Sequence, residues 1–222
     1  MSFEKKYKDL VYVVIDVESN GPSVKKNSMF SVGGVAIEVT TKTVLGSFHF
    51  NVKESKGSLI DKNCWDNFWS KHHIMYELLH KNQCDESDVV TFICNFIKHF
   101  VDKGKKIFFA SDNSVFDWKW IDTCILNHRE ENPLGHNALD IFSYAAGVFK
   151  EPRHNVMKTI KKYPKKFNVD KIEHNHNPYM DALQEACLLI DIIRYSENLE
   201  PKKLTNTALI EPFNSVYIPN DI

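Results

Sequence analysis

The chain has 222 residues, of which 43% are hydrophobic, 12% aromatic and 26% charged, and its formal net charge is −1. This length and composition predict one domain with a sizeable core and exclude a disordered or fibrous protein. The near-neutral charge gives no whole-chain signal for nucleic acid or membrane binding, so a polyanionic partner would have to be held by a local patch or by metal ions.

The cysteines and the N-terminal stretch indicate the compartment. Five cysteines are odd in number and form no Cys-x-x-Cys pair, which argues against a disulfide framework and a zinc knuckle. The opening MSFEKKYKDL lacks a signal-peptide core, and no window approaches the roughly 18 apolar residues of a membrane helix. We therefore expect a soluble intracellular protein, cytoplasmic or nuclear, that has no membrane partner. The sequence indicates no oligomeric state.

The first half of the chain predicts three strands and two helices. Residues 10–15 form a continuous β-branched and aromatic run, typical of a strand buried on both faces. Residues 30–39 and 44–52 predict two further strands in an antiparallel meander with the first. Aromatic residues at helical spacing predict a helix over 62–81, and Asp85 then predicts the cap of a second amphipathic helix.

The second half predicts a strand at 106–110, a helix at 114–126, and short helices at 139–149 and 156–160. A further helix is predicted from Pro178 to Tyr195, with Asn177 as its cap. This order indicates an α/β domain, a mixed sheet covered by helices, over residues 1–197. Three prolines and little periodicity predict an irregular tail over 198–222.

Two carboxylates follow the first strand in the stretch VVIDVESNG. Side chains two apart on a strand share a face, so Asp16 and Glu18 project together at its end, and Gly21 lets backbone approach a ligand. An Asp-x-Glu pair is weak by itself, because about one is expected by chance in such a chain.

Further acids and a histidine follow at two later helix starts. Asp117 comes in the first turn after the strand at 106–110, where a carboxylate also simply stabilises a helix by about 0.3 to 1 kcal/mol. His176 precedes the last helix and Asp181 lies one turn inside it, so both can face one point. His174 could take the place of His176 beside Asp181, but the spacing favours His176.

The joint order of these motifs resembles the DEDDh family of 3′-to-5′ exonucleases, whose fold is ribonuclease H-like. The similarity lies in DVESNG from Asp16, NSVFD ending at Asp117, and HNPYMDA from His176, with support from FSVGGVAI and LDIFSYAA. The resemblance implies a mixed five-stranded sheet, with an antiparallel meander of three strands plus parallel strands, flanked by helices.

The resemblance also implies catalytic roles. Asp16, Glu18, Asp117 and Asp181 would hold two divalent cations, Mg²⁺ or Mn²⁺, and His176 would be the general base. Elementary electrostatics agrees, since two unit charges 4 Å apart repel by roughly 4 kcal/mol at an effective dielectric near 20. Clustered carboxylates therefore need cations, and oxygen ligands suit Mg²⁺ and Mn²⁺. Paired ions clamp the attacking and leaving oxygens of a phosphodiester displacement.

Several residues are candidates for substrate contact. In the family the backbone after the first motif touches the terminal nucleotide, which corresponds here to Ser19, Asn20 and Gly21. Pro22, Met29 or Phe30 could stack on the terminal base, although Phe30 also suits the core. Asn113 either orients the site or caps its helix. The basic stretch over 153–166 is either a solvated face or a path for the phosphate backbone.

The predicted function is metal-dependent 3′-to-5′ hydrolysis of single-stranded DNA or RNA with a free 3′ end, which releases nucleoside 5′-monophosphates. A module on the same fold that binds nucleic acid or another partner without turnover is the alternative. Stepwise, chelator-sensitive shortening of an end-labelled strand separates the two.

Overall fold

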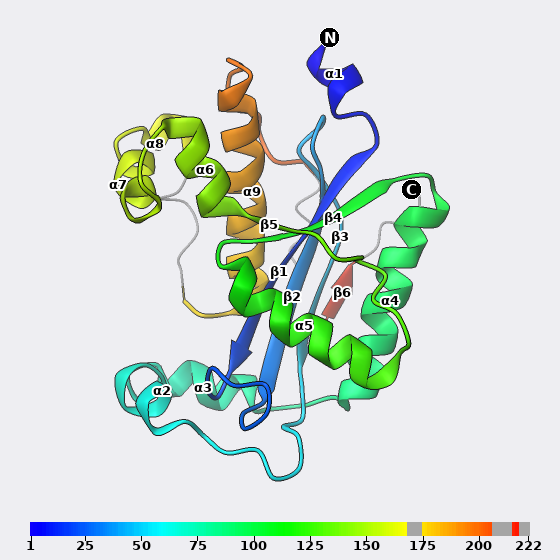
Figure 1. Ribbon diagram of the computed structural model, residues 1–222, viewed down its shortest axis with the longest axis vertical. Coiled ribbons are helices and arrows are strands. Elements are labelled where there is room, and N and C mark those ends of the chain that lie inside the picture. The colour runs from blue at the N-terminus through cyan, green and yellow to red at the C-terminus, as the bar shows by residue number, and fades with distance from the viewer. Residues whose placement is uncertain (168–174, 206–214, 218–222) are drawn as a thin grey trace.

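Strands β1 (Leu10–Ser19), β2 (Met29–Glu38) and β3 (Thr43–Asn51) form an antiparallel meander at the centre of the computed structural model, which describes residues 1–167, 175–205 and 215–217. β4 (Lys106–Ser111) pairs with β1 in parallel, and β5 (Ala138–Asp140) pairs with β4 in parallel. A short β6 (Ser215–Tyr217) completes the sheet, whose order is β5-β4-β1-β2-β3-β6. Figure 1 shows this sheet flanked by helices.

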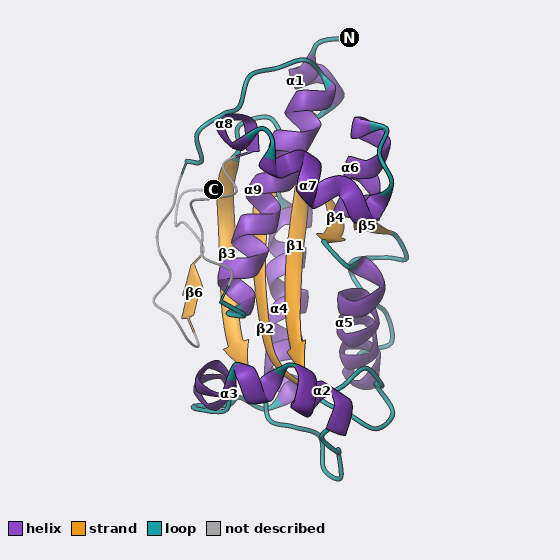
Figure 2. Ribbon diagram, turned by 90° about the vertical axis from the view of Figure 1, so that its left-hand side faces the viewer, coloured by secondary structure: helices purple, strands orange, loops and turns teal. Residues whose placement is uncertain are grey.

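Helices cover both faces of the sheet. They are α1 (Phe3–Lys6), α2 (Lys62–Asn67), α3 (His73–Leu79), α4 (Glu86–Asp102), α5 (Ser114–His128), α6 (Ile141–Phe149), α7 (Val156–Lys161), α8 (Pro164–Phe167) and α9 (Pro178–Ser196), with 3₁₀ turns η1 (Trp69–Lys71) and η2 (Arg153–Asn155). α4 and α5 pack on one face, α9 with α6 to α8 on the other, and α2 and α3 lie across one end (Figures 1 and 2). The predicted mixed sheet flanked by helices is confirmed. Among the described residues, none of the helices combines the length and apolarity needed to cross a bilayer.

The alternation of β1 decides where its carboxylates point. Val13, Ile15 and Val17 are buried against the core that α4 and α5 cover, whereas Val14 is buried against the core under α9. Side chains two apart on a strand share a face. Asp16 and Glu18 follow Val14 by two and four residues, so they also project on the α9 face.

The helix predicted over 62–81 is wrong as a continuous element. It is divided into α2, η1 and α3, because Phe68 adopts φ −130° and ψ −73° and His72 adopts φ −115° and ψ 28°, both outside helical geometry. The break places Trp69 fully inside the protein, where its indole N–H donates to the carbonyl of Ser19 at 2.9 Å. Aromatic spacing indicated the buried face, but this hydrogen bond between distant segments leaves no trace in the spacing.

Gly33 on β2 allows α9 to lie directly on the sheet. A Cβ at this position would come within 2.2 Å of the backbone N of Tyr179, so no other residue fits without moving the helix. Asn177 caps α9 as predicted, since its side chain accepts from the N–H groups of Tyr179 and Met180. Pro178 occupies the first turn. The start of α9 is therefore fixed against the middle of the sheet.

The segment after α9 contributes to the sheet edge. The N–H of Val44 donates to the carbonyl of Thr205, and β6 pairs antiparallel with β3. The sheet therefore has one strand more than the five expected, from a segment expected to be irregular. Residues 206–214 and 218–222 of the predicted tail lie outside the described residues, and the domain boundary at 197 stays a prediction. Residues 139–140, predicted as helix, belong to β5.

Candidate active site

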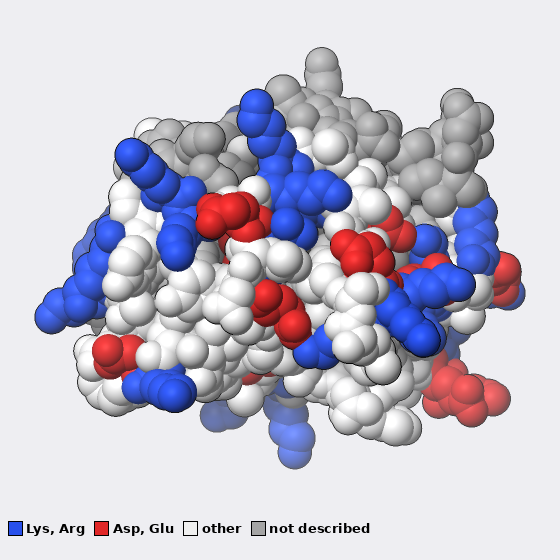
Figure 3. Space-filling view, turned by 90° about the horizontal axis from the view of Figure 1, so that it is seen from above, with Lys and Arg blue, Asp and Glu red and all other residues white. Residues whose placement is uncertain are grey.

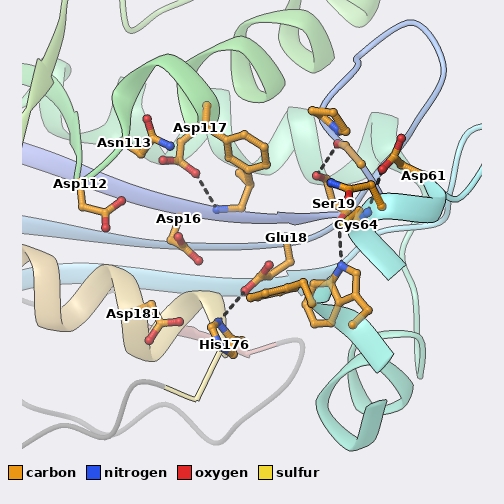
Figure 4. Close-up of a pocket in the computed structure, with 17 residues that line it drawn as sticks. Asp16, Glu18, Ser19, Asp61, Cys64, Asp112, Asn113, Asp117, His176 and Asp181 are labelled. Carbon is orange, nitrogen blue, oxygen red and sulfur yellow. Dashed lines mark hydrogen bonds and ion pairs between the residues drawn. The ribbon is translucent and has the colours of Figure 1, made fainter. Parts of the chain in front are cut away.

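A pocket of about 510 Å³ opens where β1 and β4 end, between α9, α5 and the α2–η1 segment. All but two of the residues predicted for the site line it, namely Asp16, Glu18, Ser19, Gly21, Asn113, Asp117, His176 and Asp181. They come from segments about 60 to 100 residues apart in the sequence, and parallel pairing of β1 with β4 brings the ends of these strands to one edge. Figure 4 shows the carboxylates of this group facing a common space.

The first two carboxylates are held by the end of β1. Glu18 pairs across to Ser31 on β2, and the register shifts between Glu18 and Ser19. Such bulges bend a strand and re-aim the side chains beside it. Both acids lie on the α9 face, and the Oδ2 atom of Asp16 is buried and accepts no hydrogen bond from the described residues. That oxygen is available to a ligand from outside the chain.

Asp117 is fixed to the same strand by hydrogen bonds. Its Oδ1 accepts the N–H of Val17 at 3.2 Å, and its Oδ2 accepts the hydroxyl of Ser111 at 2.8 Å. The carboxylate is 2% exposed. The first turn of α5 is thus joined to the stretch between Asp16 and Glu18, which brings the first two predicted motifs into contact.

The third predicted motif lies at the start of α9. Asp181 is 2% exposed, and the Nδ1 atom of His176 lies 4.0 Å from the Oε1 atom of Glu18. His176 has φ +60°, a left-handed conformation that is uncommon for a residue with a side chain. Its ring packs edge-on against Phe68 with centroids 4.6 Å apart, and against His72 at 4.3 Å. The strained backbone and the two rings together orient the imidazole toward Glu18.

The clustered acids perturb one another. Burial raises the pKa of Asp16 well above its usual range, and the charges of Glu18 and Asp117 raise it further. Burial and the nearby Asp181 likewise raise the pKa of Glu18. Burial raises the pKa of Asp117 to about 7, even though hydrogen bonds from Ser111 and Val17 oppose the shift. In the absence of cations the cluster therefore holds protons at neutral pH.

The donor set fits a hard divalent cation. Ligand atoms of Glu18, His176 and Asp181 all lie within 4.8 Å of one another, and the buried Oδ2 of Asp16 projects into the same space. Carboxylate oxygens dominate the set, which suits Mg²⁺ or Mn²⁺ better than zinc. A cation also offsets the burial of charge and the mutual repulsion that raise the pKa values of Asp16 and Glu18.

The backbone after the first motif lines the same pocket. The carbonyl of Ser19 accepts from Trp69, and the Ser19 hydroxyl donates to the carbonyl of Gly21 at 2.8 Å. Lys119 on α5 reaches over to donate to the carbonyl of Pro22 at 2.8 Å, and its ammonium lies 4.5 Å from the centre of the Phe116 ring. This loop is therefore held on both sides, and Pro22 and Phe116 form an apolar wall.

Two predicted substrate contacts do not reach the pocket. Phe30 is 0% exposed and packs among Trp69, Tyr76 and His80, so its ring cannot stack on a base and belongs to the core. Asn20 is also fully buried, where its Oδ1 accepts the N–H of Ser28 at 2.8 Å and stabilises the loop.

The structure describes Asn113 but not His174, the alternative general base. Asn113 lines the pocket and is the N-cap residue of α5, but its side chain makes no capping hydrogen bond. The residue is exposed beside the acids, which favours the other role considered for it, orientation of the site. His174 lies outside the described residues.

Glu185 and Phe68 contribute more than the sequence indicated. The Oε2 atom of Glu185 accepts the N–H of Asp112 at 3.0 Å, and Arg153 donates to the Asp112 carbonyl at 2.8 Å. The turn between β4 and α5 is therefore held from both sides. Glu185 lies one turn after Asp181, and this spacing indicates that both side chains share the helix face toward the site. Nothing in the sequence indicated that Phe68 faces His176.

Comparisons with known proteins agree with this site. The chain is 28% identical over 145 residues to the 3′-5′ DNA exonuclease Cap18 of Escherichia coli, a match that covers 62% of this chain and 69% of the relative. No family model matches the chain.

Solved structures share the fold. The nuclease domain of 3′hExo, a DEDDh family member bound to rAMP, superposes with a TM-score of 0.65 at 16% identity, over 88% of this chain and 97% of that domain. An E. coli exonuclease I complex with single-stranded DNA gives a TM-score of 0.60 at 12% identity, over 85% of this chain and 41% of that one. The predicted ribonuclease H-like fold and the resemblance to DEDDh 3′-to-5′ exonucleases are thereby confirmed.

Proposed function

We propose that this chain is a metal-dependent exonuclease that shortens single-stranded DNA or RNA from a free 3′ end and releases nucleoside 5′-monophosphates. The observation that carries the proposal is the convergence of Asp16, Glu18, Asp117 and Asp181 with His176 around one pocket. The similarity to a 3′-5′ DNA exonuclease supports the same chemistry.

The four carboxylates would hold two Mg²⁺ or Mn²⁺ ions, which would supply an activated water and neutralise charge on the scissile phosphate. Asp117 is held rigidly by Val17 and Ser111, so its oxygens stay in place while a substrate enters. Asp16 offers the buried Oδ2 that no described residue satisfies. His176 would accept the proton of the attacking water, since its ring faces the acid cluster from the start of α9.

The terminal nucleotide would occupy the side of the pocket formed by the Ser19–Gly21 backbone. Pro22, Phe116 and Phe68 provide apolar surface there for the base, in place of the buried Phe30. A solved neighbour in complex with single-stranded DNA supports a single strand as the substrate class, and one bound to rAMP supports a pocket for one nucleotide.

The test uses 5′-labelled single strands with free or phosphate-blocked 3′ ends, incubated with Mn²⁺ or Mg²⁺ and then with chelator. We expect stepwise shortening of the free strand, arrest by the chelator, and nucleoside 5′-monophosphates as products. Matched DNA and RNA strands assign the preferred sugar. Asp117→Ala should be inactive, and Asp102→Ala, at an exposed site on α4, is the matched control. Binding without shortening would indicate a module that does not turn over its ligand.

A further inference from the structure

A second cavity, of about 370 Å³, lies between α6, α7 and α9 on the other side of the acid cluster. Phe142, Met157 and Leu188 make its apolar wall, and Lys161 stands among its polar residues. The volume falls in the range of about 300 to 1,000 Å³ that is typical of small-ligand sites. We call it the α7 groove.

The α7 groove adjoins the candidate active site directly. Asp112 and Asp181 line both cavities. A phosphodiester held at the acid cluster therefore has one cavity on each side of it. If the terminal nucleotide lies beside Ser19 and His176, the nucleotide on the 5′ side of the scissile phosphate faces the α7 groove.

Some residues of helix α7 pack in the core and others line the α7 groove. Val156 and Ile160 are fully buried under α9 and fix the helix on the domain. Met157 and Lys161 stand one turn apart on the groove side. A methionine beside an aromatic ring gives an adaptable apolar surface for a base of any identity, and the lysine beyond it is placed for a phosphate.

The surface that continues from the groove is positively charged. No acidic residue occurs between positions 152 and 169. Exposed lysines continue along α7 and α8, namely Lys158, Lys161, Lys162, Lys165 and Lys166, and none of them forms an ion pair with another described residue. Figure 3 shows lysine and arginine side chains along the side of the molecule where α7 and α8 lie, at the left of the view. In a chain of net charge −1, this concentration marks a local site for a polyanion.

We propose that the α7 groove and the lysines of α7 and α8 bind the nucleotides on the 5′ side of the scissile bond, with a base against Met157 and Phe142 and the following phosphates along the lysines. The inference rests on the proposed function for the direction of the strand. It gives the protein a binding surface for longer single strands that lies outside the pocket of the terminal nucleotide.

The test measures binding and hydrolysis separately in the full chain. The double variant Lys158→Glu/Lys161→Glu is compared with Lys103→Glu. Lys103 is exposed just past the end of α4, near the start of β1 and β4, whereas the candidate active site lies where these strands end. Anisotropy of labelled oligothymidylates gives affinity against salt, and kcat/KM is measured for a dinucleotide and a dodecamer. We expect about tenfold weaker binding of the dodecamer and a log–log salt slope shallower by about 0.7 per lost phosphate contact. The ratio of kcat/KM for dodecamer to dinucleotide should fall similarly, and Lys103→Glu should alter neither quantity.

The outcomes separate this inference from the proposed function. Weaker, less salt-dependent binding in the double variant supports the α7 groove even if no strand is hydrolysed, in which case the proposed function fails alone. Hydrolysis by the wild type with affinity, salt slope and length ratio unchanged in the double variant overturns the α7 groove alone. An equal loss of kcat/KM on dinucleotide and dodecamer also overturns the α7 groove, because the substitutions would then act at the acid cluster. Absence of both binding and hydrolysis in the wild type overturns both proposals.

Met157→Ala provides a charge-neutral check on the same groove. It should weaken dodecamer binding several-fold without changing the salt slope, because it removes a surface for a base and no cation. An unchanged affinity would exclude a base against Met157 and overturn that part of the proposal.

Discussion

The carboxylate of Asp117 accepts the peptide N–H of Val17 at 3.2 Å, in the stretch between Asp16 and Glu18. This contact joins residues 100 apart in the sequence and sets the first turn of α5 against the end of β1. The other oxygen of Asp117 accepts from Ser111, the last residue of β4. The carboxylate of Asp117 is therefore positioned by both strands before any ligand arrives.

Replacement of Asp117 by Asn should abolish hydrolysis without unfolding the protein. Asn keeps an oxygen that can accept from Val17, but it lacks the negative charge required for a cation. We expect a loss of at least about 100-fold in kcat and no fall in the midpoint of thermal unfolding in chelator. Labelled-strand assays and circular dichroism measure the two effects. Activity near that of the wild type would remove Asp117 from the cation site.

The metal-free protein should lose stability as pH rises. Burial raises the pKa of Asp117 from an ordinary 3.8 to about 7 in the folded state, so the folded state binds the proton more tightly than the unfolded state does. This contribution is fully present below about pH 4 and is lost as pH rises through 7. At about 1.4 kcal/mol per pKa unit, the loss is on the order of a few kcal/mol.

Urea unfolding in chelator at mildly acidic and mildly alkaline pH measures this dependence. Asp117→Asn should show a smaller pH dependence, since its side chain does not titrate. Saturating Mn²⁺ should stabilise the wild type most at the alkaline pH, because bound cations favour the ionised acids. A wild-type protein equally stable at both pH values in chelator would contradict the raised pKa of the buried Asp117.

The sequence specified the site better than the surroundings that hold it. Asp16 and Glu18 were recognisable because a strand places alternate residues on one face, and α9 because Asn177 and Pro178 are local signals. Phe30 has the same apolar character whether it stacks on a base or fills a core. Only its contacts with Trp69 and Tyr76, from a different segment, decide between the two. Features that depend on such distant contacts could not be predicted from local patterns.

Substitution of Gly33 by Ala should disturb α9 and the acid that it carries. The new Cβ would meet the backbone N of Tyr179 at 2.2 Å, and backbone cannot move aside as the end of a side chain can. We expect destabilisation of about 1 to 3 kcal/mol and weaker Mn²⁺ binding, because Asp181 would shift with the helix. Chemical denaturation and Mn²⁺ titration followed by calorimetry measure the two effects.

Gly147→Ala is the matched control for that substitution. A Cβ at Gly147, inside α6, meets nothing within 4 Å, and Ala favours a helix by about 0.8 to 1 kcal/mol over Gly. This variant should be as stable as the wild type or more so, with unchanged Mn²⁺ affinity. Equal behaviour of the two variants would show that α9 does not depend on close approach at Gly33.

Replacement of Phe68 by Leu should lower the rate of hydrolysis without weakening cation binding. The Phe68 ring packs edge-on against His176 with centroids 4.6 Å apart, and it offers no ligand atom to a cation. Leu preserves apolar volume but loses this contact, so the imidazole gains freedom and spends less time facing Glu18. We expect kcat to fall by about tenfold, less than the roughly 100-fold cost of a misplacement of about 1 Å, because the His72 ring still contacts His176. Mn²⁺ affinity should stay unchanged. Phe108→Leu, on an exposed ring of β4 that packs against Tyr12, is the control and should alter neither quantity. A normal kcat in Phe68→Leu would show that the left-handed backbone of His176 and the His72 ring suffice to orient the imidazole.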